Sequence, residues 1–181
     1  MRRRAAIAIA SSFFILVTAC NKGRESSRVS TADNRVAPRV ARLYFESDSM
    51  LLVAEPRNVQ LPGNPAAAMS LVVRELLKGP VNPALSRQFP ADTTVRGAYL
   101  LPDGSAFIDL GGNTLAQGWS AGSHEELMAA SSLVQTIASN FPEAKRVRIL
   151  VNGMTAETLG GHLAIDRFLH PDSSLVDPRM R

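Results

Sequence analysis

Cys20 is the only thiol in the sequence, and the residues before it suggest what chemistry it undergoes. The chain starts with the cationic run Met1-Arg2-Arg3-Arg4 and continues with a mostly apolar stretch from Ala5 to Val17. A stretch of about 13 residues is typical of a secretory signal and short for a bilayer span. The small residues Thr18 and Ala19 then precede the cysteine. A thiol at this position is a candidate for modification where the signal ends.

The run Leu16-Val17-Thr18-Ala19-Cys20 resembles the lipobox of bacterial lipoproteins, in which the chain is cut before the cysteine and the thiol is acylated, for example by palmitate. The alternative is an ordinary signal peptide with a chance cysteine. On the lipoprotein interpretation, residues 1–19 are the signal peptide and Cys20 is the lipidation site. We then expect the protein to be anchored in the cell membrane or outer membrane, facing the periplasm or the cell exterior.

Charge limits the partners of the mature chain. The sequence of 181 residues has 20 Lys and Arg against 16 Asp and Glu, a net charge of +4. Three of the arginines lie in the signal, so the remaining 181 − 19 = 162 residues carry 17 − 16 = +1. A near-neutral chain gives no electrostatic reason to expect nucleic acid as a partner.

Apolar patterns predict a single folded domain over residues 39–169. Residues 20–38 have few large apolar side chains and predict a disordered tether, and residues 170–181 predict a flexible tail. The order of predicted elements is β-β-α-β-β-α-β, which favours an α+β fold, a single two-layer sandwich with two helices on one sheet. The expected strands are 40–45, 50–53, 93–100, 105–110, 147–151 and an edge strand at 160–165. The expected helices begin at caps formed by Asn64-Pro65 and by a Ser123/Glu126 capping box, and they end at Gly79-Pro80 and Pro142.

One sequence match suggests a nucleophile. Gly118-Trp119-Ser120-Ala121-Gly122 fits the G-x-S-x-G pattern of hydrolase nucleophile elbows, which need a strand running directly into the turn. Here the loop 111–117 separates Ser120 from the preceding strand, and the chain is too short for the large parallel sheet of those enzymes. We therefore interpret the segment as a loop ahead of the Ser123 helix cap.

The other reactive side chains form no catalytic or metal-binding pattern. The histidines His124, His162 and His170 lack metal-ligand spacing, and no cysteine joins them. Asp103 belongs to a predicted turn, and Asp109 is expected to face solvent or to cap a nearby loop. We expect no catalytic residue, no metal and no cofactor.

Two features could instead bind a partner. Lys145, Arg146 and Arg148 form a small basic patch on a predicted strand; the alternative is a solvated strand face whose charge discourages unwanted pairing. Trp119 is the only tryptophan, and in the loop Gly111–Gly122 it could stack on a sugar.

Taken in order, several segments resemble the GerMN domain, first associated with sporulation and spore-germination lipoproteins. The similar stretches are Arg42–Phe45, Leu52–Arg57, Leu71–Pro80, Phe89-Pro90, Thr93–Leu110, Leu133–Ile137, Val147–Gly153 and Gly160–His162. Phe168-Leu169 stands where a proline often follows the arginine in the family, and only one copy of the domain fits this chain, whereas some members carry two.

The resemblance implies a fold similar to ring-building motifs, with no catalytic residues to carry over. We therefore expect a membrane-anchored, non-catalytic scaffold that interacts with envelope proteins, whose identity the sequence does not give, and homo-oligomerisation stays open. The candidate interaction residues are Arg146, Arg148 and Trp119. The alternative is a lipoprotein that binds a ligand or cell-wall glycan through the Gly111–Gly122 loop.

Overall fold

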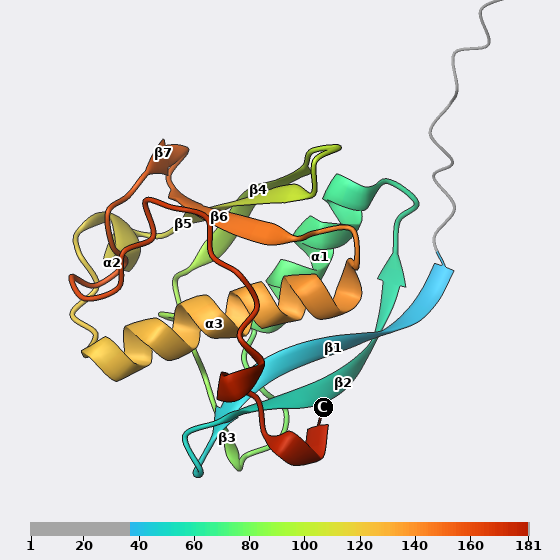
Figure 1. The fold of residues 1–181 in the computed structure, drawn as a ribbon, viewed down its shortest axis with the longest axis horizontal. Helices are drawn as coiled ribbons and strands as arrows, with labels where there is room; N and C mark the ends of the chain where they lie inside the picture. Colours follow the sequence, from blue (N-terminus) through green and yellow to red (C-terminus); the bar gives the residue numbers. More distant parts are fainter. Residues whose placement is uncertain (1–36, 181) are drawn as a thin grey trace, which may run out of the picture. The chain divides into compact units, whose positions relative to one another are not determined.

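The computed structural model describes residues 37–180, whose strands form two sheets (Figure 1). One sheet has three strands in the order β2-β1-β3, and the other has four in the order β4-β5-β6-β7. Neighbouring strands are antiparallel except β5 and β6, which are parallel and are joined through α3. The elements are β1 (Ala37–Ser47), β2 (Leu52–Leu61), α1 (Pro65–Leu77), β3 (Leu85–Ser86), β4 (Thr94–Leu100), β5 (Ser105–Gly111), α2 (Asn113–Ala116), α3 (Ser123–Asn140), β6 (Arg146–Val151), β7 (Met154–Thr155), η1 (Ser173–Leu175) and η2 (Pro178–Met180).

The two long helices, α1 and α3, pack against each other, and each contacts both sheets. Figure 1 shows α3 crossing between the β1–β2 hairpin and the strands β4–β6. The α+β class and the order of the main elements are confirmed. The single sheet with both helices on one face is corrected, because the first hairpin belongs to a sheet of its own.

The two sheets are separate because a helix, rather than a strand, lies along one edge of β1. The N–H of Arg42 donates to Asn140 Oδ1 (3.0 Å), and its carbonyl accepts from Asn140 Nδ2 (2.8 Å). The N–H of Tyr44 donates to Thr136 Oγ1 (3.0 Å), and its carbonyl accepts from Ser132 Oγ. These α3 residues are four apart and share one helix face. With α3 occupying this edge, no strand of the second sheet can pair there.

The same pairing explains how β2 extends past the predicted end of its strand at residue 53. β2 contains Pro56, which has no N–H and is normally tolerated only where a sheet needs no hydrogen bond from it. Pro56 lies opposite Arg42 in the ladder. Because the backbone of Arg42 bonds to Asn140 on the other edge, it requires no donor from Pro56.

The ends of α1 are as the sequence predicts. The side chain of Asn64 accepts from the N–H of Ala67 (3.0 Å), and Pro65 opens the helix. Beyond the last turn, Gly79 adopts φ +85°, a left-handed conformation that favours glycine. The predicted helix boundaries therefore follow from local chemistry alone.

An ion pair on β2 holds the C-terminal end of α1. Arg57 donates to the carbonyls of Glu75 (2.9 Å) and Gly79 (3.1 Å) and pairs with Glu55. Glu55 Oε2 in turn accepts from the N–H groups of Val81 and Asn82, both at 2.9 Å. Burial alone would raise the pKa of Glu55, but these N–H groups and Arg57 lower it. The Leu52–Arg57 and Leu71–Pro80 stretches of the family resemblance are thus in direct contact.

The main core draws apolar side chains from both sheets and both long helices, including Leu43, Val72, Ile108, Leu133 and Ile149. A smaller cluster joins Tyr44, Leu52, Met128 and Val176. Continuous packing of this kind makes residues 37–180 behave as one folded body rather than as two sheets side by side.

The C-terminal residues differ from the expected flexible tail. Val176 is 2% exposed and forms a parallel bridge with Leu52, and the N–H of Asp177 donates to the Leu52 carbonyl (2.9 Å). Figure 1 shows η1 and η2 beside the β1–β2 hairpin. The tail packs because Val176 fills the smaller core cluster, a contact that no local pattern reveals.

The predicted signal peptide, Cys20 and most of the tether lie outside the described residues. Among residues 37–180, no helix has the length and apolar character needed to cross a membrane.

The pairing of α3 with β1 predicts that Thr136→Val will destabilise the fold. Valine has nearly the same shape, but it leaves the buried N–H of Tyr44 without an acceptor, so we expect a loss of about 1–3 kcal/mol in the free energy of unfolding. Urea denaturation measures it. Thr155→Val, at an exposed position of β7, is the matched control. Equal stability of the two variants would contradict a supporting role for α3 at this edge.

Candidate functional site

Ser120 does not lie on a strand-to-helix turn. β5 ends at Gly111, and the short helix α2 (Asn113–Ala116) stands between that strand and Ser120. Ser120 borders a shallow hollow, and no histidine lines that hollow. The structure therefore does not assemble a nucleophile elbow from these residues.

The three histidines lie apart in different settings. His124 Nε2 is 2.5 Å from Glu46 Oε1, and His162 Nδ1 is 3.5 Å from Glu126 Oε2. His170 is exposed. Within residues 37–180, no three His, Cys, Asp or Glu side chains gather as metal ligands would.

Asp103 and Asp109 each stabilise a turn. Asp103 Oδ1 accepts from the N–H of Ser105 (2.9 Å), and this bond, more than the nearby Arg146, lowers the pKa of Asp103. Asp109 Oδ1 accepts from the N–H of Gly153 (2.8 Å). Asp109 therefore caps the loop after β6, one of the two roles expected for it.

Arg146 and Arg148 enclose an aromatic ring. Their guanidinium carbons lie 4.3 Å and 4.9 Å from the ring centroid of Phe168. Arg146 also donates to Ser105 Oγ (2.9 Å) and pairs with Asp103 (3.1 Å), and Arg148 donates to the Asp166 carbonyl. The two arginines thus point away from the core, as predicted, but they also fasten the chain segment after residue 165 to β6.

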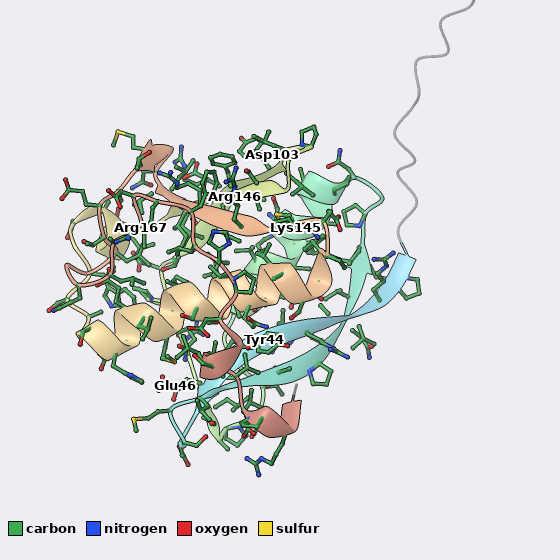
Figure 2. The ribbon with its side chains drawn as sticks, viewed as in Figure 1. Tyr44, Glu46, Asp103, Lys145, Arg146 and Arg167 are labelled. Atoms are coloured by element: carbon green, nitrogen blue, oxygen red, sulfur yellow. The ribbon has the colours of Figure 1, made fainter. Side chains whose placement is uncertain are left out.

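The face of the four-stranded sheet that points away from the core carries Tyr99, Phe107, Arg146 and Arg148, and Phe168 packs on it. We call these five residues the outer aromatic face. Tyr99 lies directly opposite Phe107 in the β4–β5 ladder, so both rings are on one face. Phe107 meets Phe168 edge to face at 5.5 Å. Tyr99 is 58% exposed. Figure 2 shows Asp103 and Arg146 on this side of the molecule, and Glu46 beyond α3.

Glu126 has a structural role that differs from the one predicted from the sequence. The N-cap of α3 is Gly122, and no side chain caps this end, so the predicted Ser123/Glu126 capping box is wrong. Glu126 is fully buried, and its oxygens accept from the N–H groups of Leu159 and His162, both at 2.7 Å. The loop at 159–163 offers several N–H groups to one carboxylate, and they outcompete the single N–H at the helix start.

The predicted edge strand at 160–165 is irregular in the structure. Backbone N–H groups of this loop bond to the Glu126 carboxylate rather than to a neighbouring strand. Burial alone would raise the pKa of Glu126, but backbone N–H groups at residues 159–163 outweigh it and lower the pKa. The loop lies close to Trp119, because a Cβ on Gly160 would be 2.8 Å from the Trp119 carbonyl oxygen. Glu126 therefore fixes the backbone next to Trp119.

Trp119 borders a hollow of about 380 Å³ between the β1–β2 turn, β3 and the start of α3. Its side chain is half-buried and packs against the main core. The hollow is open to solvent, and polar residues form most of its wall: Glu46, Asp48, Gln88, His124 and Glu125 contribute to it. The loop that carries Trp119 thus lies beside a concave polar surface.

A protein-family model described as Germane, sporulation and spore germination, matches residues 42–157, more than half of the chain. No curated protein is significantly similar to the sequence.

Solved structures show the same fold. A candidate lipoprotein from Clostridium perfringens aligns with TM-score 0.54 and 20% identity, covering 78% of this chain and 94% of that one. The first GerMN domain of the sporulation protein GerM from Bacillus subtilis aligns with TM-score 0.52 and 19% identity, covering 78% and 98%. The tandem GerMN domains of that protein align with TM-score 0.57 and 18% identity, covering 73% of this chain and 46% of theirs, so this chain spans about half of the tandem.

The Glu126 contacts predict a pH-dependent contribution to stability. The folded pKa lies below the ordinary value of 4.5, so the stabilisation is present above about pH 4.5 and is lost as the pH falls through the folded pKa. Glu126→Gln should cost about 2–3 kcal/mol at neutral pH, because an amide has one acceptor oxygen and its NH2 group would face the second backbone N–H. Urea denaturation at pH 7 and pH 3 should show a smaller acid-induced loss in the variant than in the wild type.

Glu143→Gln, at an exposed position, serves as the control and should behave as wild type. If Glu126→Gln is equally destabilised at both pH values, the ionised carboxylate does not stabilise the loop.

Proposed function

Because the chain belongs to the Germane family, we propose that it is a lipid-anchored lipoprotein of the cell envelope whose GerMN-like domain binds other envelope proteins and catalyses no reaction. Acylated Cys20 would hold the domain at the membrane through the tether 20–38. A short tether raises the effective concentration of the domain near other membrane components, so weak contacts suffice.

The outer aromatic face is the observation that carries the interaction proposal. Tyr99 is 58% exposed and Leu101, on the same hairpin, is 45% exposed. Aromatic and arginine side chains are enriched at protein interfaces, where they contribute most of the binding energy. In residues 37–180, β4 pairs with β5 alone and is therefore an edge strand beside this face. A partner could thus contact both the rings and the strand edge.

Two other sheet edges, those of β1 and β6, are partly occupied. α3 occupies part of the free edge of β1, and Leu169 exchanges two backbone hydrogen bonds of 2.8 Å with Val147 on β6. Three of the polar side chains that could do chemistry have structural partners: Asp103 and Asp109 hold turns, and Glu126 holds a loop. These assignments support recognition by shape and backbone rather than catalysis.

The hollow beside Trp119 favours a second candidate, a lipoprotein that binds a small ligand or a cell-wall glycan. A concave wall that combines one aromatic ring with several polar groups is the common form of a ligand site. Trp119 is the residue of the loop 111–122 that lines this hollow.

Cys20→Ser tests the anchor. Two or three acyl chains give durable membrane binding, since each buried methylene contributes about 0.8 kcal/mol. The variant should move to the soluble fraction or remain unprocessed, which membrane fractionation and immunoblotting measure. A variant that matures normally and stays in the membrane would exclude lipidation at Cys20.

Tyr99→Glu tests the interface. Tyr99 is exposed, so the variant should keep the wild-type thermal stability, but a charge on the outer aromatic face should weaken binding. The control is Val40→Glu, at a position 61% exposed on β1. In membranes, a photo-crosslinker at position 99 should give a discrete protein adduct that a crosslinker at position 40 does not give. The same adducts from both positions would place the interface elsewhere.

Arg146 and Arg148 are less suitable for this test. Charge reversal there would break the contacts with Asp103 and Phe168 as well as change the surface. Loss of a partner in such a variant could therefore reflect a change in the fold.

A further inference from the structure

A hollow between α1 and β4 has a different chemistry from the one beside Trp119. It has a volume of about 350 Å³ and is open to solvent. One wall comes from the last turn of α1 and its C-cap residue Lys78, and the other comes from Arg87 and from residues 91 and 93–95 on the chain that leads into β4. None of these residues belongs to the outer aromatic face, so a ligand bound here would leave the proposed protein interface free.

Every charged side chain that lines this hollow is positive: Arg74, Lys78 and Arg87. Lys78 is balanced by Glu75, whose Oε1 lies 2.6 Å from its Nζ. Arg74 is exposed, and no side chain within residues 37–180 pairs with its guanidinium. Arg87 bonds to neutral carbonyls, which leave its charge unbalanced. Two arginine charges are therefore available to attract an anion.

The end of α1 would by itself repel an anion, because free helix carbonyls give that end a partial negative charge. Arg87 removes this obstacle. Its two terminal nitrogens donate to the carbonyls of Leu77 and Lys78, both at 2.6 Å. Since Arg87 covers these carbonyls, the helix end presents a positive group to the hollow.

Thr93 supplies evidence that does not depend on charge. It is 6% exposed and lines the hollow, and its Oγ1 is buried with no hydrogen-bond partner among residues 37–180. The adjacent Asp92 does not serve as its acceptor, because Asp92 accepts from the N–H of Thr114 (2.9 Å). A buried hydroxyl without a partner costs free energy, and such groups are rare in native proteins. The hydroxyl hydrogen rotates to suit its acceptor, so an anion oxygen in the hollow would satisfy it.

The rest of the wall is apolar and limits the kind of anion. Leu77, Ala91 and Val95 contribute it, so a bare inorganic ion would leave apolar surface in contact with water. Carboxylates and phosphates match arginine best, because their oxygens pair with two guanidinium N–H groups at once. The hollow therefore suits an oxyanion attached to a short apolar group.

We propose that this hollow binds a carboxylate or phosphate carried on an apolar group, held by Arg74, Arg87 and the Thr93 hydroxyl. This site goes beyond the envelope function proposed above, and it stands whether or not the outer aromatic face binds a protein.

The purified full-length chain, isotope-labelled for NMR, is titrated with hexanoate, hexyl phosphate, acetate and hexylamine. We expect saturable shifts of the amide signals at residues 93–95 with both hexyl anions, and these should weaken as salt is added. Acetate should bind roughly tenfold more weakly than hexanoate, because it lacks the chain that contacts the apolar wall. Hexylamine should leave these signals unchanged. Tighter binding of hexanoate than of hexyl phosphate indicates a carboxylate as the natural group, and the reverse order indicates a phosphate.

Thr93→Val tests the hydroxyl. Valine has nearly the same shape, and the hydroxyl that it replaces bonds to nothing in residues 37–180, so the melting temperature should stay the same or rise. Binding of hexanoate should nevertheless weaken roughly fivefold. A hydroxyl with only a structural role would not separate the two measurements in this way.

Arg74→Gln tests the charge and should weaken the binding of hexanoate roughly tenfold. The matched control is Arg167→Gln, which removes the same charge from an exposed position that does not line the hollow. It should bind hexanoate as the wild type does.

Four results would overturn the proposal. The first is the absence of shifts with both hexyl anions, and the second is an equal response to hexylamine, which would show apolar binding without selection for charge. The third is wild-type affinity or a lower melting temperature in Thr93→Val, since either result would exclude an unpartnered hydroxyl as part of the site. The fourth is equal weakening in Arg74→Gln and Arg167→Gln, which would show a general charge effect instead of a site.

Discussion

The backbone of β1 needs hydrogen-bond partners along both edges, and the arrangement of the two sheets depends on how it finds them. On one edge β2 supplies a regular ladder. On the other, α3 supplies side chains at positions 132, 136 and 140, and β3 continues the pairing at Glu46 and Ser47. An unpaired buried N–H or carbonyl costs about 1–3 kcal/mol, so an edge covered in this way is stable without a further strand. The hairpin and the four-stranded sheet can then pack on the same helices without joining.

The same requirement shapes the loops, where carboxylates take the place of strand partners. Glu55 accepts from the N–H groups of Val81 and Asn82, and Glu126 accepts from those of Leu159 and His162. Both have lowered pKa values, because backbone N–H groups stabilise the ionised form more than burial destabilises it. A domain without a disulfide among its described residues thus fixes irregular segments through buried ions. Both carboxylates are thereby committed to the backbone.

The two surfaces left over differ in character and lie on different sides of α3 (Figure 2). The outer aromatic face is a sheet surface with exposed rings and arginines, suited to another protein. The Trp119 hollow is concave and lined mainly by polar side chains. Glu126 links the core to the second surface, because the loop it holds packs against the backbone of Trp119.

Local chemistry in the sequence was enough to predict the α+β class, the main element order and the ends of α1, because caps such as Asn64 and Gly79 act within a few residues. The stretches that carried the GerMN resemblance include Glu55, Arg57 and Gly79, which contact one another directly. Contacts distant in sequence decided the rest. Glu126 looked like part of a capping box because its actual partners lie more than 30 residues away, and the tail looked loose because Val176 finds its pocket against Leu52 and Met128. The division into two sheets could not be predicted from the sequence either. Ser132, Thr136 and Asn140 resemble ordinary helix residues there, and they bond to β1 only when α3 lies along that strand. Hydrogen bonds between distant segments form only once the chain has folded, so only the tertiary structure could place them.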